Sequence, residues 1–279
     1  MRTVSEFIRD KTLFVTGATG FLGQSLVEKI LWSVPDVRRI YVLIRAQPQL
    51  GGRVRLAQER LERELFQSSC FDRLRSTHGD GLVEFLSEKL VAVPGDLSNE
   101  DLGLEPALRL RLQEEIDVFI NSAAVVSFDA PLDEALELNV LGAGKIARFA
   151  RSCPKCVLIH VSTAYVCGAA THSIPESLYH TAAEDEGGLF PTRKFSDPDR
   201  DIDHMREIIT RVLEQSQDPQ QDRRFKEALI KRFRTSRGKN SRRREKIDNL
   251  RNRWIKDQLT KEGMNWARER GWNDTYTYT

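Results

Sequence analysis

The stretch that decides the fold is a turn punctuated by glycines, Thr16-Gly17-Ala18-Thr19-Gly20-Phe21-Leu22-Gly23. An apolar run over residues 11–15 precedes it, and a helical pattern over residues 21–32 follows. The first glycine permits a tight turn from strand to helix, the second lets a phosphate approach the backbone, and the third lets the helix lie close to the sheet. The start of the helix also offers free N–H groups to an anion. The turn therefore predicts a dinucleotide site, the alternative being a turn that only joins strand and helix.

The composition indicates an ordinary globular protein. The chain has 279 residues, 40% of them hydrophobic, and a net charge of +2. This fits one large α/β domain or two small ones and indicates no particular partner. No apolar run reaches the roughly 18 to 20 residues of a membrane span, and the first residues lack the apolar core of a signal peptide. Four cysteines are too few for a disulfide framework, so we expect a cytoplasmic protein.

Four further apolar runs predict the rest of a sheet. They cover residues 39–45, 90–93, 117–121 and 157–162, with helical patterns between them. Strands that alternate with helices predict an α/β fold with a doubly wound parallel, Rossmann-like sheet. We expect the last strand to be buried. The Cys153-Pro154-Lys155-Cys156 stretch before it is interpreted as ordinary thiols, with a zinc or redox pair as the alternative.

Charged residues at the strand ends suggest which dinucleotide binds. Arg45 ends the second strand, where its planar guanidinium suits the 2′-phosphate of NADP better than the 2′-hydroxyl of NAD. The alternative is a solvated charge. Asp96 follows the third strand, where it could accept a hydrogen bond from the adenine amino group or cap the next helix. Small residues after the fourth strand would let a flat cofactor lie against the backbone.

Two polar regions interrupt the pattern. Residues 46–88 form an insertion with a turn at 47–52 and a helix expected over 53–66, and its function cannot be predicted. A loop rich in proline and glycine is expected over residues 170–203, followed by charged helices. The basic run 223–256 could attract nucleic acid, an anionic membrane or the phosphates of coenzyme A, or it could be a solvated helical face.

Apolar side chains recur near helical spacing within this basic region. They are Phe225, Leu229, Ile230 and Phe233. We expect them to pack on the domain or on an acyl chain.

Several motifs, taken together, resemble the extended short-chain dehydrogenase/reductases. They are the glycine turn, Gly95-Asp96-Leu97, Asn121-Ser122-Ala123-Ala124 and Val161-Ser162-Thr163-Ala164-Tyr165-Val166. The turn, the strand at 41–45 and the tail Asp274-Thr275-Tyr276-Thr277-Tyr278-Thr279 look like fatty acyl-CoA reductases of the bacterial type. The resemblance implies reduction of a long-chain fatty acyl-CoA to a fatty aldehyde or alcohol, with NADPH as cofactor. It implies cofactor contacts from Thr16, Gly17, Thr19, Gly20, Phe21, Leu22, Gly23, Arg45, Asp96, Leu97, Asn121, Ala123 and Ala124.

The resemblance also implies two catalytic residues. Ser162 would hold the substrate carbonyl, and such a donor stabilises the oxyanion that grows as hydride arrives. Tyr276 occupies the tyrosine position of a Y-x-x-x-K motif and would donate a proton. The lysine position comes directly after Thr279, so we expect a truncated chain in which the C-terminal part of the family pattern is missing.

The resemblance implies a division into three parts and leaves two other functions open. Residues 1–169 would bind NADP, residues 170–270 would be a charged helical insertion, and residues 271–279 would begin the tyrosine helix. A carrier-protein thioester reductase would share the same motifs, and a non-catalytic NADP-binding or interaction protein would need no lysine. We expect no metal and no specific nucleic acid; peripheral contact with a membrane and the oligomeric state stay open.

Overall fold

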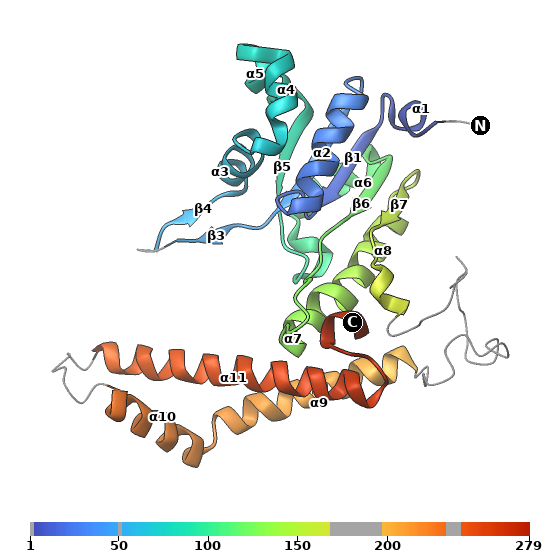
Figure 1. Ribbon diagram of the computed structural model, residues 1–279. Coiled ribbons are helices and arrows are strands. Elements are labelled where there is room, and N and C mark those ends of the chain that lie inside the picture. The colour runs from blue at the N-terminus through green and yellow to red at the C-terminus, as the bar shows by residue number, and fades with distance from the viewer. Residues whose placement is uncertain (1–2, 50–51, 168–196, 233–240) are drawn as a thin grey trace. The chain divides into compact units, whose positions relative to one another are not determined.

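The computed structural model describes residues 3–49, 52–167, 197–232 and 241–279 (Figure 1). They divide into two compact units. The first spans Met1–Ala124 and Leu138–Thr163, and the second spans Val125–Glu137 and Ala164–Thr279. The predicted helical insertion thus falls in the second unit, which also includes residues that the sequence assigned to the parts on either side of it.

The first unit is built on a five-stranded parallel sheet with the order β5-β2-β1-β6-β7. From β1 the chain proceeds to β2 and β5 on one side and then to β6 and β7 on the other, so the sheet is doubly wound. This confirms the predicted fold class. The strands are β1 Thr12–Thr16, β2 Arg39–Ile44, β5 Leu90–Pro94, β6 Val118–Asn121 and β7 Val157–His160.

Helices cover both faces of this sheet (Figure 1). Successive strand residues point to opposite faces, so Leu13 and Val15 of β1 join one buried cluster and Phe14 joins the other. The ring of Phe14 lies 4.8 Å from that of Phe119 and 6.0 Å from that of Phe149, centroid to centroid. The helices on the first face are α2 Phe21–Ser33, α3 Ala57–Leu61, α4 Asp72–His78 and α5 Leu82–Lys89; on the second they are α6 Pro106–Glu115 and α8 Gly142–Ser152.

The polar insertion folds into a hairpin followed by helices. Strands β3 Gln47–Pro48 and β4 Val54–Arg55 pair in antiparallel fashion, and α3 continues as a π-helical turn, Glu62–Phe66. The helix expected over 53–66 therefore begins later than predicted, because its first residues are held in the hairpin.

The outer strand β7 differs from its prediction. Its side chains are exposed, Val157 and Ile159 among them, so the expectation of a buried strand is wrong. Among the described residues β7 stands at the end of the sheet order and pairs with β6 alone. Before it, Cys153 is buried and its Sγ donates to the carbonyl oxygen of Phe149 at 3.3 Å, while Cys156 is half-buried. The interpretation of both as ordinary thiols stays a prediction.

The second unit is helical where the structure describes it. Its helices are α7 Leu132–Ala135, α9 Pro198–Ser216, α10 Pro219–Arg232, α11 Ser241–Glu269 and α12 Thr275–Tyr278. Helix α9 begins inside the predicted loop because proline is well tolerated in the first turn and the Asp197 side chain accepts a hydrogen bond from the Asp199 amide. The earlier part of that loop, residues 170–196, lies outside the described residues.

The apolar residues of α10 fulfil their prediction in part. Phe225 and Leu229 are buried, and the Phe225 ring lies 6.1 Å from that of Trp254 in α11. Ile230 is 54% exposed, so its predicted packing on the domain is wrong, whereas packing on an acyl chain stays a prediction. Phe233 lies outside the described residues. Within the part of the chain that the structure describes, no helix is both long and apolar enough to cross a bilayer.

Candidate functional site

A cavity of about 310 Å³ lies at the carboxyl ends of the parallel strands in the first unit. Open α/β sheets bind ligands at this edge, where the strand order reverses. The predicted cofactor residues that line it are Thr16, Gly17, Thr19, Gly20, Arg45, Asp96, Leu97, Ala123 and Ala124. The other lining residues, which the predicted set of cofactor contacts did not include, are Leu43, Ile44, Arg60, Gly95, Ser122 and Leu138.

At two glycines of the turn, neighbouring backbone lies in close contact, as the sequence predicted. Gly17 has φ +72°, and a Cβ at this position would lie 2.6 Å from the carbonyl oxygen of Ser122. A Cβ at Gly23 would lie 2.1 Å from the carbonyl oxygen of Gly17. Helix α2 begins after Gly20 with no side chain capping it, so its first N–H groups remain available to an anion.

Three residues of the predicted set sit around the start of α2 without lining the cavity. Phe21 is 92% exposed and Leu22 is also exposed, so their side chains face solvent. Gly23 is buried against the turn. A ligand at the glycine turn would therefore meet the backbone of this first helical turn.

Asn121, also predicted to contact the cofactor, is buried and joins strand ends instead. Its Oδ1 accepts from the Thr16 hydroxyl and, at 3.2 Å, from the Ala123 amide. Its Nδ2 lies 2.9 Å from Nδ1 of His160 at the end of β7. Asn121 thus ties together β1, β6 and β7 and fixes the backbone that borders the cavity.

Two arginines lie at the end of β2. The Arg45 side chain is 65% exposed, and its Nε lies 3.9 Å from Oδ2 of Asp96. Arg60 of α3 donates from Nη1 to the carbonyl oxygen of Arg45 at 2.6 Å and pairs with Glu64 at 2.7 Å. Sequence reasoning missed Arg60, because it reaches this edge only after the hairpin has turned the chain back.

The loop after β5 is held from within the fold. Oδ1 of Asp96 accepts from the Ser98 amide at 2.9 Å, so one of its oxygens stabilises the turn. The buried Lys145 of α8 donates from Nζ to the carbonyl oxygens of Ser98 at 2.8 Å and of Leu97 at 3.4 Å. Lys145 supports the loop that carries Asp96 and Leu97, another role that no motif indicated.

The two predicted catalytic residues belong to different units. Ser162 is exposed beyond the end of β7, next to Val161, whose amide donates to the carbonyl oxygen of Asn121 at 2.9 Å. Tyr276 lies on α12 in the second unit. The structure therefore defines the surroundings of each residue within its own unit.

Helix α12 is anchored by its other tyrosine. The Tyr278 hydroxyl donates to Oδ2 of Asp201 in α9, and Nη2 of Arg270 lies 3.4 Å from Oδ1 of the same carboxylate. Burial, together with this hydrogen bond to a carboxylate, raises the pKa of Tyr278 to about 12. The side chain stays protonated at neutral pH and holds α12 beside α9.

Removing the Tyr278 hydroxyl should destabilise the protein in a pH-dependent way. We expect Tyr278→Phe to lower the free energy of unfolding by about 1.5 kcal/mol, since a hydrogen bond to a charged group is lost. The folded-state pKa lies above that of an unfolded tyrosine, so the difference is fully present below about pH 10 and shrinks as the pH rises toward the folded-state value. Urea unfolding of both proteins across this range tests it. A difference that does not change with pH would contradict the assignment.

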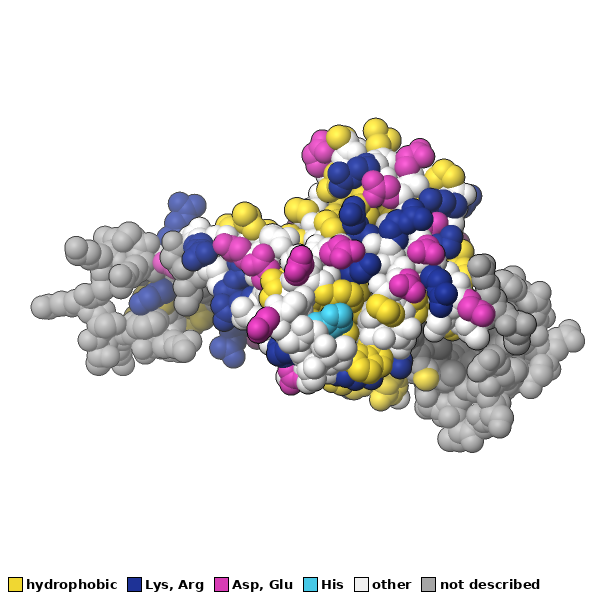
Figure 2. Space-filling model, turned by 90° about the horizontal axis from the view of Figure 1, so that it is seen from above, with side chains coloured by type: hydrophobic (Ala, Val, Ile, Leu, Met, Phe, Trp, Pro, Cys, Tyr) yellow, Lys and Arg dark blue, Asp and Glu magenta, His cyan; other side chains and the backbone are white. Residues whose placement is uncertain are grey.

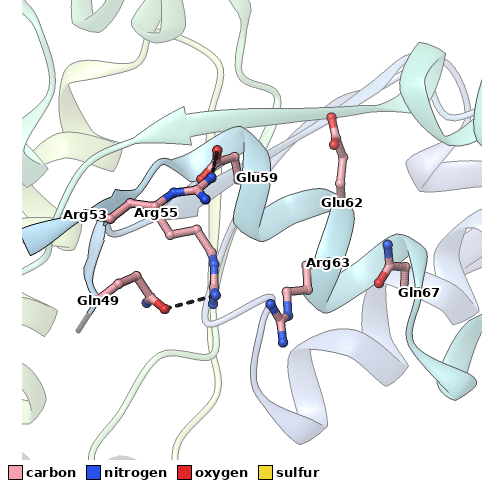
Figure 3. A pocket seen from close by; sticks show the side chains of 7 residues that line it. All are labelled: Gln49, Arg53, Arg55, Glu59, Glu62, Arg63 and Gln67. Atoms are coloured by element: carbon pink, nitrogen blue, oxygen red, sulfur yellow. Dashed lines mark hydrogen bonds and ion pairs between the residues drawn. The ribbon is translucent and has the colours of Figure 1, made fainter. Parts of the chain in front are cut away.

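A second cavity, of about 560 Å³, lies in the polar insertion (Figure 3). Its lining side chains largely satisfy one another: Arg53 pairs with Glu59 at 3.1 Å, and Arg55 donates to Gln49 at 3.0 Å. No residue of the glycine turn borders it. The larger cavity is therefore not the predicted dinucleotide site.

Comparison with known families identifies the group to which the chain is related. An NAD-binding family model described as Male sterility protein matches residues 15–279. The chain belongs to this family. The match spans the glycine turn, strands β2 to β7 and α12, and it confirms the predicted nicotinamide-dinucleotide class of cofactor.

Relatives of this Male sterility family member carry reductase names. The chain is 45% identical over 174 residues to "Probable fatty acyl-CoA reductase 5" of Arabidopsis thaliana, covering 61% of this chain and 34% of that protein. It is 38% identical over 191 residues to "Alcohol-forming fatty acyl-CoA reductase" of Simmondsia chinensis, covering 68% and 38%. The predicted resemblance to fatty acyl-CoA reductases is thereby confirmed, whereas the narrower likeness to the bacterial type stays a prediction. The chain spans about a third of the length of these relatives.

Among solved structures, the chain is similar to the terminal R domain from the myxalamid PKS-NRPS biosynthetic pathway. The two are 30% identical with a TM-score of 0.45, over 59% of this chain and 37% of that one.

Proposed function

We propose that this chain belongs to a reductase that uses NADPH to convert a long-chain fatty acyl-CoA to a fatty aldehyde or alcohol. The observation that carries the proposal is the cavity at the glycine turn, which is bordered by two arginines in a chain of the Male sterility family. The names of the relatives support the substrate class.

The residues at the cavity fit NADPH. The glycine turn has no room for a Cβ at Gly17 or Gly23, and the uncapped start of α2 suits a pyrophosphate. Arg45 and Arg60 would hold the 2′-phosphate, which NADH lacks. Ala123 and Ala124 line the cavity with small side chains, against which a flat ring could lie.

In the proposed reaction the protein fixes the carbonyl and supplies the proton. NADPH, when bound, supplies hydride. Ser162 would donate a hydrogen bond to the carbonyl oxygen as negative charge develops there. Tyr276 would donate the proton. One NADPH and one proton convert the thioester to an aldehyde and free coenzyme A thiol, and a second round gives the alcohol.

The test is oxidation of NADPH by the complete product of the gene that encodes this chain, called the full-length protein below, with palmitoyl-CoA or with a palmitoyl-loaded carrier protein. We expect turnover with palmitoyl-CoA and release of free thiol. Turnover on the carrier alone would move the substrate class to carrier-bound thioesters. Tight NADPH binding with no turnover on either substrate would contradict the proposed reaction.

Arg45 and Arg60 should determine the preference of the protein for NADPH over NADH. We expect Arg45→Ala and Arg60→Ala each to weaken NADPH binding by roughly tenfold or more, because a charge-assisted contact to phosphate is lost. NADH binding should change little. Arg63→Ala is the matched control, since Arg63 lines the other cavity. Equal losses for both dinucleotides in calorimetric titrations would contradict the assignment.

We infer a cytoplasmic location and, for α10 and α11, at most peripheral contact with an anionic membrane. Part of their basic charge is paired: Arg251 lies 2.9 Å from Asp222 and 3.0 Å from Asp248, and Lys256 lies 3.8 Å from Glu134. On the face seen in Figure 2, Lys and Arg side chains stand among Asp and Glu. Salt-sensitive sedimentation of the protein with anionic vesicles would support membrane contact. If the protein does not sediment with the vesicles, membrane contact is contradicted.

A further inference from the structure

Three aromatic rings contact one another in the second unit. The centroid of Phe128 lies 5.4 Å from that of Tyr165 and 5.6 Å from that of Tyr276, and the two tyrosines are 6.3 Å apart. Every pair meets edge to face, with interplanar angles of 75°, 66° and 62°. This is a favoured arrangement of aromatic rings, which constrains each ring by its neighbours. The candidate proton donor is therefore part of an aromatic cluster.

The backbone around Phe128 is fixed by hydrogen bonds. The Ala130 amide donates to the carbonyl oxygen of Ser127 at 3.2 Å, which closes a turn with Phe128 inside it. The Thr260 hydroxyl of α11 donates to the carbonyl oxygen of Asp129 at 3.4 Å. Phe128 is thus presented from a turn that is attached to α11.

The element that carries Tyr276 is held close to this turn. Helix α7, which follows the turn, packs against α11 and α12 (Figure 1). Gly263 of α11 permits this approach, since a Cβ there would lie 2.7 Å from Oγ1 of Thr275 and 3.3 Å from Cβ of Leu132. Thr275 and Leu132 are buried. The positions of Phe128 and Tyr276 are therefore set by one packed junction of three helices.

The cluster is exposed although the junction beneath it is buried. Phe128 is 48% exposed and Tyr165 is 55% exposed. Large aromatic side chains gain stability from burial, so an exposed pair beside a proton donor offers an apolar surface to a ligand. A polar group placed against the faces of these rings would lose hydration without gaining a hydrogen-bond partner there. The methylene groups of an aliphatic chain form no hydrogen bonds with water, so they would lose none on contact with these rings.

We propose that Phe128 and Tyr165 form an aromatic seat that orients Tyr276 and packs against the acyl carbons next to the substrate carbonyl. The inference rests on the proposed function, in which Tyr276 donates the proton. Phe128 and Tyr165 are positioning residues, and their rings rather than the Tyr165 hydroxyl perform the role.

Binding of a non-reducible ligand tests the seat without turnover. The probe is the hexadecyl thioether of coenzyme A, titrated into the full-length protein, with coenzyme A alone as reference. We expect Phe128→Leu and Tyr165→Leu each to weaken thioether binding by about fivefold, as an aromatic contact is lost. Binding of coenzyme A alone and of NADPH should stay unchanged. Phe128→Tyr and Tyr165→Phe keep the rings and should bind as the original protein does.

Turnover tests the orientation of Tyr276. In the full-length protein with palmitoyl-CoA, we expect the leucine variants to lower kcat by about tenfold, because a displaced proton donor reacts poorly. Their KM should rise by the factor found for thioether binding, and the two ring-preserving variants should keep both constants.

Several results would overturn the seat. The first is unchanged thioether binding in the two leucine variants. The second is a kcat of the leucine variants equal to that of the original protein. The third is that the ring-preserving variants are as impaired as the leucine variants. A different result would separate the two proposals. If thioether binding depends on both rings but the protein never oxidises NADPH with an acyl-CoA, the proposed reaction is wrong and the aromatic seat is a lipid-binding site.

Discussion

Replacing Gly23 with alanine is expected to abolish measurable NADPH binding and to lower the free energy of unfolding by about 1–3 kcal/mol. A Cβ at this position would lie 2.1 Å from the carbonyl oxygen of Gly17 and 2.7 Å from Cα of Ala18. Both atoms are backbone, so no side chain can rotate away to make room. Helix α2 would have to move off the turn and carry its N–H groups away from the pyrophosphate.

The matched control is Gly81→Ala in the same unit. A Cβ at Gly81 meets nothing within 4 Å, so this variant should bind NADPH with unchanged affinity and unfold at the same or a slightly higher urea concentration. Fluorescence titration with NADPH and urea unfolding measure both properties. A Gly23→Ala protein that binds NADPH as well as the Gly81→Ala protein would contradict the assigned role of the turn.

Replacing Tyr276 with phenylalanine in the full-length protein should lower kcat for palmitoyl-CoA by about 10²- to 10⁴-fold, the usual contribution of a positioned proton donor. NADPH affinity should not change, because Tyr276 is not among the residues that line the cavity at the glycine turn. The ring contacts with Phe128 and Tyr165 would remain, so the loss can be attributed to the hydroxyl.

Tyr278→Phe is the control for this variant. It removes a hydroxyl from the same short helix, and that hydroxyl is bound to Asp201. We expect lower stability with kcat reduced far less than in Tyr276→Phe. If instead Tyr278→Phe abolished turnover while Tyr276→Phe kept it, the assignment of the proton donor would be wrong.

The sheet and the glycine turn could be predicted because local sequence determines them. Apolar runs of strand length alternate with helical patterns, and the glycines sit where the backbone has no space for a side chain. Exposure of β7 could not be predicted, since an apolar run has the same pattern in a central strand and in an outer one. Asn121 has the position of a cofactor contact, yet its side chain is used to join strand ends.

The parts of the site that depend on long-range folding escaped prediction. Arg60 reaches the cavity from the insertion, and Lys145 supports the loop after β5 from α8. Phe128 and Tyr276 are nearly 150 residues apart in sequence and meet through the packing of α7, α11 and α12. No spacing rule connects such residues, because their contact follows from tertiary structure.

The most direct test of the proposed reaction is the fate of the hydride. Full-length protein is incubated with palmitoyl-CoA and NADPH deuterated at the nicotinamide carbon that donates the hydride, with each deuterated epimer used in turn. The product is then analysed by mass spectrometry. We predict that one epimer places deuterium on the former carbonyl carbon of the aldehyde or alcohol, with release of free coenzyme A. Bound NADPH that transfers deuterium to no acyl product from either epimer would contradict the assignment as an acyl-CoA reductase.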